Sequence, residues 1–342
     1  MHINHALIDQ AAAMLRAGGL IGLPTETVYG LGADASNPAA VRAMFAAKGR
    51  PADHPVIVHL ARSEDMRDWA IDIPASAWAL AQQFWPGPLT LILKRAAHVH
   101  DAITGGQDTV GLRVPSHPVA QALLAAFAAA APGQPAGIAA PSANKFGHVS
   151  PTTAQHVRDE FGDALDLVID GGACEVGIES TIVDLSAGAA RILRPGFITA
   201  EAITAALGAS LAAPLAQKPH PEPVSAVPLV APRVSGSLDA HYAPRTRLLI
   251  VGGDALSSTL AAHAGHPIAV LSFSPARVPK TLHWRASREA RVYAHNLYAH
   301  LRAMDTSGCD LLVVEAPPEG AEWDGINDRL RRAAFGSAGS GQ

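Results

Sequence analysis

The residues best suited to chemistry lie in four polar clusters in the N-terminal part of the chain. The clusters read GLPTETVYGLG (22–32), KGRPADHPVIVH (48–59), APSANKFGHVSP (140–151), and GIESTIVD (177–184) followed by ILRPG (192–196). Each sets hydroxyl, amide or cationic side chains beside prolines or glycines. Any one of them alone could be an ordinary turn, because turns are rich in these residues.

Four cations in this region, Lys48, Arg50, Arg113 and Arg194, each flank an expected strand end or a sharp turn. Cations that converge beside hydroxyls suit a polyanionic ligand such as a nucleoside triphosphate, because guanidinium groups pair with phosphate oxygens in a planar fork. The chain has no GxxxxGK[ST] phosphate loop, and no GxGxxG turn opens a helix after its first strand. If this region binds ATP, it must use a different cradle.

Hydrophobic periodicity indicates the elements that position these clusters. It predicts a helix over 5–17 that ends at Gly18-Gly19, a strand over 19–24, and a helix capped by Asn37 that ends at Lys48-Gly49. Further strands are predicted at 55–60, 89–93, 109–114, 137–140, 165–170, 180–185 and 189–193, and further helices at 118–131 and 153–161. This alternation predicts an α/β domain with a mixed sheet, and its polar clusters lie at strand ends, where open sheets bind ligands.

A proline-rich stretch from about residue 209 to 244 separates this region from a second one. Beyond it, strand-like runs RLLIVGG, IAVLSF and CDLLVVEAP alternate with predicted helices at 255–263, 287–304 and 324–334. The predicted organisation is a first domain over 5–207, a linker over 208–246, a small α/β domain over 247–335 and a flexible tail over 336–342.

Charge, cysteine content and hydropathy exclude several classes of protein. The net charge of -4 argues against a generally basic nucleic-acid binder. Cys174 and Cys309 form no CxxC pair, and the sixteen histidines show no HExxH arrangement, so no metal site is predicted. The N-terminus lacks a secretory pattern, and no apolar run reaches the roughly 18 residues of a membrane span. We therefore expect a cytoplasmic protein without membrane contact.

Eight motifs in one order resemble the YrdC-like family in its longer two-domain form. They are PTETVYGLG, KGRPADHPVIVH, WPGPLTLIL, DTVGLRVP, APSAN, SPT, GIESTIVD and ILRPG. The similarity covers roughly residues 10–207 and, more weakly, HYAPRT at 241–246. It implies a twisted open mixed α/β sheet around a large concave, positive cavity, followed by a small Rossmann-like second domain.

The resemblance also implies a reaction. A nucleotidyltransferase of this kind joins L-threonine, bicarbonate and ATP, with Mg²⁺ accompanying the ATP, into threonylcarbamoyl-AMP and pyrophosphate. The product would feed a downstream transferase complex that completes the threonylcarbamoyladenosine modification of tRNA. An N-carboxythreonine anion would attack the α-phosphorus, so catalysis would depend on positioning and on charge rather than on a side-chain nucleophile.

The matching positions divide into two sets. The implied threonine site comprises Thr27, His59, Arg113, Ala140 and Ser180, with Arg113 on the carboxylate. The implied ATP site comprises Arg50, His54, Thr109, Ser142, Asn144, Ser150, Arg194 and Tyr242, and Lys48 and Arg50 would be catalytic beside the phosphates. Tyr29 and the glycines after it would shape the pocket floor. His241 and Tyr242 would form a strap that covers the site and orders when ATP binds.

Other interpretations remain open on the sequence. A concave basic surface could hold double-stranded RNA or tRNA without catalysis, and a weak RNA contact could accompany an enzyme as well. Carbamoyl transfer, as in hydrogenase maturation, uses the same domain but adds zinc-finger cysteines that this chain lacks.

Glu179 is expected to pair with Arg194 rather than act as a base, and the basic helix at 287–304 is expected to present a solvated face. Phe146 departs from the small polar residue usual in the family.

Overall fold

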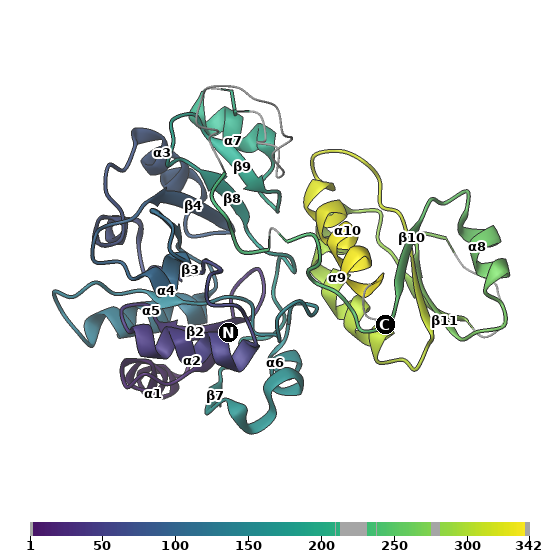
Figure 1. The fold of residues 1–342 in the computed structure, drawn as a ribbon, viewed down its shortest axis with the longest axis horizontal. Helices are drawn as coiled ribbons and strands as arrows, with labels where there is room; N and C mark the ends of the chain where they lie inside the picture. Colours follow the sequence, from purple (N-terminus) through teal and green to yellow (C-terminus); the bar gives the residue numbers. More distant parts are fainter. Residues whose placement is uncertain (1–2, 209, 213–230, 237, 275–280, 339–342) are drawn as a thin grey trace.

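The computed structural model describes residues 3–208, 210–212, 231–236, 238–274 and 281–338. Figure 1 shows a larger domain, coloured purple to teal, beside a smaller one, coloured green to yellow. Part of the predicted linker (209, 213–230 and 237) lies outside the described residues. Within the described residues, no helix is both long and apolar enough to cross a membrane.

The larger domain is built on a nine-stranded sheet of order β7-β1-β2-β6-β3-β5-β4-β8-β9. Its strands are β1 (Ile21–Leu23), β2 (Gly30–Asp34), β3 (Ile57–His59), β4 (Leu89–Lys94), β5 (Thr109–Arg113), β6 (Ile138–Ala139), β7 (Leu167–Val168), β8 (Thr181–Asp184) and β9 (Arg191–Arg194). The sheet contains three parallel pairs (β1–β7, β3–β5, β4–β8), and its other neighbouring strands are antiparallel. The mixed α/β fold class predicted from the sequence is therefore confirmed.

Helices cover both faces of this sheet. They are α1 (His5–Arg16), α2 (Pro38–Lys48), α3 (Ala75–Phe84), α4 (Asp101–Thr104), α5 (Pro118–Ala129), α6 (Ala154–Phe161) and α7 (Ala200–Leu207), with short 3-10 helices η1 (Ser63–Asp68) and η2 (Gly162–Ala164). Helices α1 and α5 share one core cluster with Ile21, Leu23 and Ile138. Residues of α2, α3 and α6 pack with Leu31 and Ala33 in another cluster.

Strand β2 was not predicted, because its glycines resemble a turn. In the structure, Leu31 and Ala33 face one core while Gly30 and Gly32 face the other, as the two-residue period of a strand requires. A β-carbon on Gly32 would come within 2.8 Å of the Leu23 side chain. Glycine is thus placed here for a close approach between strands.

Helix α2 shows how the sequence sets the position of the second polar cluster. The Asn37 side chain accepts hydrogen bonds from the backbone of Ala39 and Ala40, and Pro38 occupies the first turn. Gly49 ends the helix in the left-handed region at φ 63°. Lys48 then reaches the turn that carries Ser142 and Asn144, and Arg50 reaches the Pro55 carbonyl just before β3.

The smaller domain contains a four-stranded parallel sheet of order β10-β13-β11-β12. Its elements are β10 (Leu248–Val251), α8 (Leu256–Ala262), β11 (Ile268–Ser272), β12 (Thr281–Arg285), α9 (Ala290–Asp305), β13 (Leu311–Glu315) and α10 (Asp324–Ala338). Ile268 and Val270 pack with α8 on one face, whereas Ala269 and Leu271 pack with α9 and α10 on the other. This doubly covered parallel sheet is Rossmann-like, as expected.

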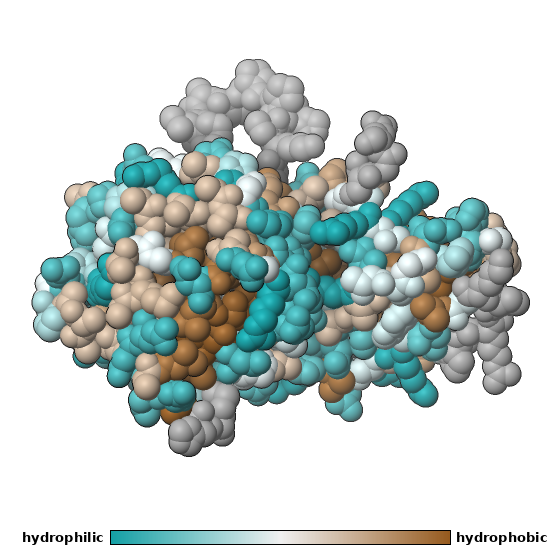
Figure 2. All heavy atoms as spheres, turned by 90° about the horizontal axis from the view of Figure 1, so that it is seen from below, coloured by the Kyte–Doolittle hydropathy of each residue, from teal (hydrophilic) through white to brown (hydrophobic). Residues whose placement is uncertain are grey.

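The two domains share a hydrophobic core. Val149, Val176 and Ile178 of the larger domain pack in one cluster with Leu297 of α9 and Ile326 of α10. Figure 1 shows α9 and α10 on the side of the small sheet that faces the larger domain, and α8 on the far side. Figure 2, seen from below, shows a continuous hydrophobic area on the larger domain, while the smaller one presents a more polar surface.

Some predictions were wrong in the second half of the chain. Strand β12 has mostly exposed side chains at the sheet edge, so its sequence lacks the apolar run that marks a strand. The predicted tail at 336–342 begins too early, because α10 continues through Ala338, where Gly336 approaches Ala243 closely. The basic face of α9 is not simply solvated: Arg302 donates to the Val149 carbonyl and pairs with Glu160 at 2.9 Å.

The domain contact yields a stability prediction. Gly177 has φ +81°, and a β-carbon there would lie 2.5 Å from His295 Cα in α9. Gly172 has φ +83° but has nothing within 4 Å of the same position. Both Gly→Ala variants carry the strain of the left-handed region, about 1–2 kcal/mol. Gly177→Ala should lower the free energy of unfolding by about 1–3 kcal/mol more than Gly172→Ala, because it also overpacks the contact. Chemical denaturation measures this difference, and equal losses in the two variants would contradict the proposed tightness of the contact.

Candidate functional site

A cavity lined by residues of several strands of the large sheet and of the loops next to them brings the four polar clusters together. It encloses about 510 Å³, including its open mouth. Its walls are formed by Thr25, Thr27, Val28, Gly30, Arg50, Ile57, His59, Arg113, Ala140, Pro141, Ser142, Glu179, Ser180, Arg194, Ser235, Gly236, His241 and Tyr242. Nine of these were assigned from the sequence to the threonine or the ATP site, namely Thr27, Arg50, His59, Arg113, Ala140, Ser142, Ser180, Arg194 and Tyr242.

Arg113 is fixed at the end of β5 by buried partners. Its guanidinium donates to Thr27 Oγ1 at 2.9 Å and to Glu26 Oε1 at 2.6 Å, and the Arg113 and Glu26 side chains are each only 4% exposed. Glu26 also accepts a hydrogen bond from the Ser116 backbone at 3.1 Å. Glu26 therefore orders the loop and holds Arg113 in a defined orientation.

His59 contributes an unsatisfied polar atom to the cavity wall. The side chain is 2% exposed, and Nδ1 has no hydrogen-bond partner among the described residues. Burial, and then the nearby charge of Arg113, lower the pKa of His59 to about 3. The ring is therefore neutral at physiological pH, and Nδ1 is free to meet a polar group of a ligand.

Arg50 and Arg194 also line the cavity, and both contact Ser235 of the linker. Arg50 donates to the Pro55 carbonyl at 2.7 Å and to Ser235 Oγ at 3.1 Å. Arg194 donates to the Ser235 carbonyl at 2.8 Å and to the Ser180 carbonyl and hydroxyl at 2.9 and 3.1 Å. Burial lowers the pKa of Arg50 to about 10, so it stays charged at neutral pH.

Lys48 is not among the residues that line the cavity. Its ammonium donates to the Ser142 carbonyl at 2.5 Å and to the Asn144 carbonyl. Burial, followed by the charge of Arg50, lowers the pKa of Lys48 well below its usual value. In this structure Lys48 ties the end of α2 to the turn that carries Ser142 and Asn144.

The remaining residues assigned to ATP lie around the cavity rather than in its wall. Asn144 donates to the carbonyls of Lys145 and His148, and its Oδ1 is buried without a partner among the described residues. His54 packs edge-on against Phe146, with ring centroids 5.3 Å apart. Thr109 lines a neighbouring hollow beside Ser235. Ser150 does not line the cavity, but it donates to Oε1 of the lining residue Glu179 at 2.6 Å.

Tyr29 does not form the pocket floor, contrary to expectation. Its hydroxyl donates to the Gly172 carbonyl and accepts from the Gly171 backbone, which makes it part of the core. Gly30 lines the cavity, but Gly32 does not. The two glycines face the same side of β2, and only the first lies at the strand end.

The described part of the linker forms a strap across the cavity. Here the strap means residues 231–236 and 238–244. Ser235, Gly236, His241 and Tyr242 line the cavity, and the Ala243 backbone donates to the Gly147 carbonyl at 2.8 Å. Tyr242 adopts φ 60° and stacks on Tyr298 of α9, with ring centroids 5.7 Å apart. The strap is therefore held by both domains.

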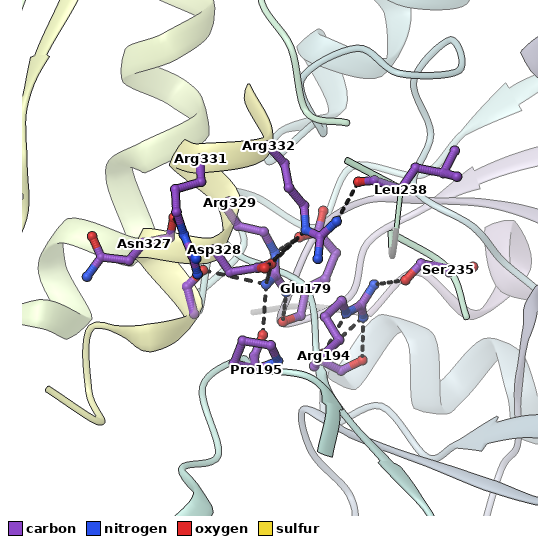
Figure 3. Close-up of polar contacts among 12 residues, drawn as sticks. Glu179, Arg194, Pro195, Ser235, Leu238, Asn327, Asp328, Arg329, Arg331 and Arg332 are labelled. Carbon is purple, nitrogen blue, oxygen red and sulfur yellow. Dashed lines mark hydrogen bonds and ion pairs between the residues drawn. The ribbon is translucent and has the colours of Figure 1, made fainter. Parts of the chain in front are cut away.

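Glu179 has a different partner from the one expected. Figure 3 shows it between Arg194 and Arg329 of α10, and its ion pair, at 2.8 Å, is with Arg329. The sequence did not suggest Arg329 or Tyr298 as site residues, since they lie far along the chain from the motifs, and it did not suggest Ser235 either. Ser235 belongs to the segment SGSLDAHYAP, whose retained His-Tyr was the available signal.

Comparison with known proteins places the chain in a family. The family model Sua5_yciO_yrdC, described as telomere recombination, matches residues 13–196. A second model, Sua5_C, described as the C-terminal domain of threonylcarbamoyl-AMP synthase, matches residues 198–335. The chain therefore belongs to the two-domain Sua5 branch of this family of α/β enzymes, and the resemblance to YrdC-like proteins is confirmed.

Relatives that span both domains carry one name. Threonylcarbamoyl-AMP synthase of Pyrococcus abyssi is 36% identical, covering 95% of this chain and 93% of the relative. That of Bacillus subtilis is also 36% identical, covering 97% and 94%. The crystal structure of P. abyssi Sua5 complexed with L-threonine superposes with a TM-score of 0.86 at 34% identity, covering 98% and 96% of the two chains.

The buried state of His59 predicts a pH effect on stability. The pKa of His59 is lowered from 6.5 to about 3 in the folded state. Between these two pH values, His59 is therefore protonated in the unfolded chain but neutral in the folded one. Stability should therefore fall as pH drops through this window, by up to about 1.4 kcal/mol per pH unit from this group. His59→Gln should remove that part of the slope between pH 6 and 4. Denaturant titrations measure it, with the exposed His98→Gln as control, and an unaltered slope in His59→Gln would refute the assignment.

Proposed function

We propose that this protein condenses L-threonine, bicarbonate and ATP to threonylcarbamoyl-AMP and pyrophosphate, as a nucleotidyltransferase. The observation that carries the proposal is the pairing of two cationic sites in one cavity. Arg113, which is held by Glu26, and Arg50 and Arg194, which both contact Ser235, line the same cavity. Two anions that must react with each other need such nearby cations to offset their repulsion.

The threonine site is proposed around Arg113. Its guanidinium, oriented by Glu26, would receive the substrate carboxylate as a charge-assisted pair. The free Nδ1 of His59 and the hydroxyl of Thr27 would meet the hydroxyl and nitrogen of threonine, and Ala140 would contact its methyl group. The structure of the P. abyssi relative complexed with L-threonine supports this choice of ligand.

The phosphates of ATP are proposed to bind at Arg50 and Arg194. Both arginines now donate to Ser235, so an incoming phosphate would replace the strap oxygens with stronger acceptors. Lys48 and Arg50 remain the proposed catalytic cations. To reach a phosphate, the Lys48 ammonium would have to leave the carbonyls of Ser142 and Asn144. His54, Thr109, Ser142, Asn144, Ser150 and Tyr242 would complete the nucleotide site.

The reaction needs no side-chain nucleophile. A carboxylate oxygen of N-carboxythreonine would bond to the α-phosphorus while the bond from that phosphorus to the pyrophosphate oxygen breaks. The described residues contain no group of three or more histidine, cysteine or acidic side chains placed to hold a metal ion. Mg²⁺ would accordingly be held mainly by the phosphates and water, the usual way this ion is bound with nucleotides. The product would pass in the cytoplasm to a tRNA-modifying transferase.

The first test of the function is also a test of selectivity. With ATP, Mg²⁺ and bicarbonate, threonine should release pyrophosphate, and valine should do so up to about 10⁴-fold less efficiently. Valine has the shape of threonine but leaves the polar groups that would bind the hydroxyl unpaired. Serine lacks only a methyl group and should retain measurable activity, since a methyl contact is worth roughly 1–3 kcal/mol. Equal turnover of valine and threonine would refute the pocket. A protein that only binds RNA would release no pyrophosphate with any amino acid.

The position of the strap predicts ligand-dependent protection. If ATP must displace Ser235 to reach Arg50 and Arg194, the strap opens for entry and closes again over the bound substrates. A closed site would shield the adenylate from hydrolysis. Tryptic cleavage after Arg233, whose side chain is 51% exposed, should slow when ATP and threonine are added together. A reporter peptide in the same tube controls for inhibition of the protease. A rate that does not respond to ligands would make the segment a tether.

A further inference from the structure

A carboxylate in the cavity wall stands out against the surrounding cations. Glu179 lines the cavity and is 7% exposed, and it lies on the loop before β8, beside Ser180 and Arg194. A free anion at this place would repel the phosphates proposed to bind there. It would also compete with them for Arg194, since buried unlike charges pair strongly.

The partners of Glu179 come largely from the second domain. Arg329 of α10, which is 0% exposed, donates through Nε to Glu179 Oε2 at 2.8 Å and through Nη2 to the Glu179 carbonyl at 3.2 Å. The hydroxyl of Tyr298, in α9, donates to the same Oε2 at 2.8 Å. Ser150, from the larger domain, donates to Oε1 at 2.6 Å. Three donors thus hold both oxygens of the carboxylate.

Arg329 is itself held firmly. Its Nη1 donates to the Pro195 carbonyl at 2.7 Å and pairs with Asp328 at 2.9 Å. Asp328 also pairs with Arg332 at 3.0 Å, and Arg332 donates to the Leu238 carbonyl of the strap at 2.5 Å. Figure 3 shows this chain of contacts running from α10 to both the cavity wall and the strap.

We propose that Arg329 is a positioning residue for the nucleotide site: it neutralises Glu179 and keeps it turned away from Arg194, so that Arg194 retains its charge for the phosphates. This inference rests on the proposed function, because it takes ATP as the ligand of Arg194. It gives the second domain a direct part in forming a site whose substrate contacts all come from the larger domain and the strap.

The effects of the neighbouring charges on the pKa of Glu179 support this role. Burial by itself would raise the pKa of Glu179, but Arg329, followed by Arg194, outweighs it and lowers the pKa to about 2. Arg194 is therefore the next cation available to the carboxylate once Arg329 is lost. A lysine at 329 could supply the charge but not the fork that binds the carboxylate and two carbonyls together.

The threonine site provides an internal comparison. Arg113 is neutralised by its own carboxylate, Glu26, and neither residue contacts Arg329 in the described structure. If substitution of Arg329 acts by leaving Glu179 without its partner, it should weaken ATP binding and leave threonine binding unchanged. If it acts by destabilising the fold, it should weaken the binding of both ligands.

The test compares Arg329→Gln, Glu179→Gln and the double variant by calorimetric titration with Mg-ATP and, separately, with L-threonine. Arg329→Gln should raise the Kd for ATP about tenfold or more, because the freed carboxylate takes up Arg194. The Kd for threonine should stay within about twofold. Adding Glu179→Gln should bring the Kd for ATP back to within about threefold of the wild type, since no free carboxylate remains. An unchanged Kd for ATP in Arg329→Gln, or no recovery in the double variant, would overturn the proposal.

A second variant keeps the test decisive if Arg329→Gln does not fold. Tyr298→Phe removes one donor to Glu179 while keeping the ring stacked on Tyr242. Its matched control is Tyr293→Phe in the same helix, because the Tyr293 hydroxyl is buried without a partner among the described residues. Tyr298→Phe should raise the Kd for ATP about threefold and Tyr293→Phe should not. Equal values in the two variants would overturn the proposal.

Failure of this inference is distinguishable from failure of the proposed function. A wild-type protein that binds ATP but releases no pyrophosphate with threonine and bicarbonate contradicts the function alone. A wild-type protein that makes the product while Arg329→Gln binds ATP normally contradicts the inference alone.

Discussion

Buried positive charge is the constraint on which the rest of this structure depends. Arg50, Arg113 and Arg194 line one cavity and are almost fully withdrawn from water, so each needs oxygen partners supplied by the protein. Glu26 supplies them for Arg113, and the strap residue Ser235 supplies them for both Arg50 and Arg194. Guanidinium groups fixed in this way are oriented before a substrate arrives, which is what catalysis by charge stabilisation requires.

The same constraint explains why the domains are joined so closely. Glu179 is an anion in a cationic wall, and the arginine that balances it comes from the second domain. An ion pair buried across an interface is weak evidence for stability, but removing one member would leave an uncompensated charge. The apolar cluster that spans Val149, Ile178, Leu297 and Ile326 supplies the hydrophobic burial that keeps this pair assembled.

Elements with a strong local pattern could be predicted from the sequence. Helix α2 carries its own cap, proline and terminal glycine, and strands such as β4 and β5 are short apolar runs bounded by turn residues. Strand β2 could not be predicted, because Gly30 and Gly32 are chosen by the close approach of Leu23 and Ile138 rather than by strand propensity. Strand β12 was missed because it is an exposed edge whose side chains bury little.

The sequence by itself determined to which family the chain belongs and suggested many of the polar residues that line the cavity, because the motifs at the strand ends are contiguous and their order is readable. Only the tertiary structure decided how those groups are used. In the folded protein, Lys48 donates to the carbonyls of Ser142 and Asn144, and Arg329 pairs with Glu179, which lies 150 positions earlier in the chain. The physical reason is that burial removes water as a partner, so each charged group must take the nearest complementary group in space. That neighbour is fixed by the packing of whole elements, which local sequence patterns do not record.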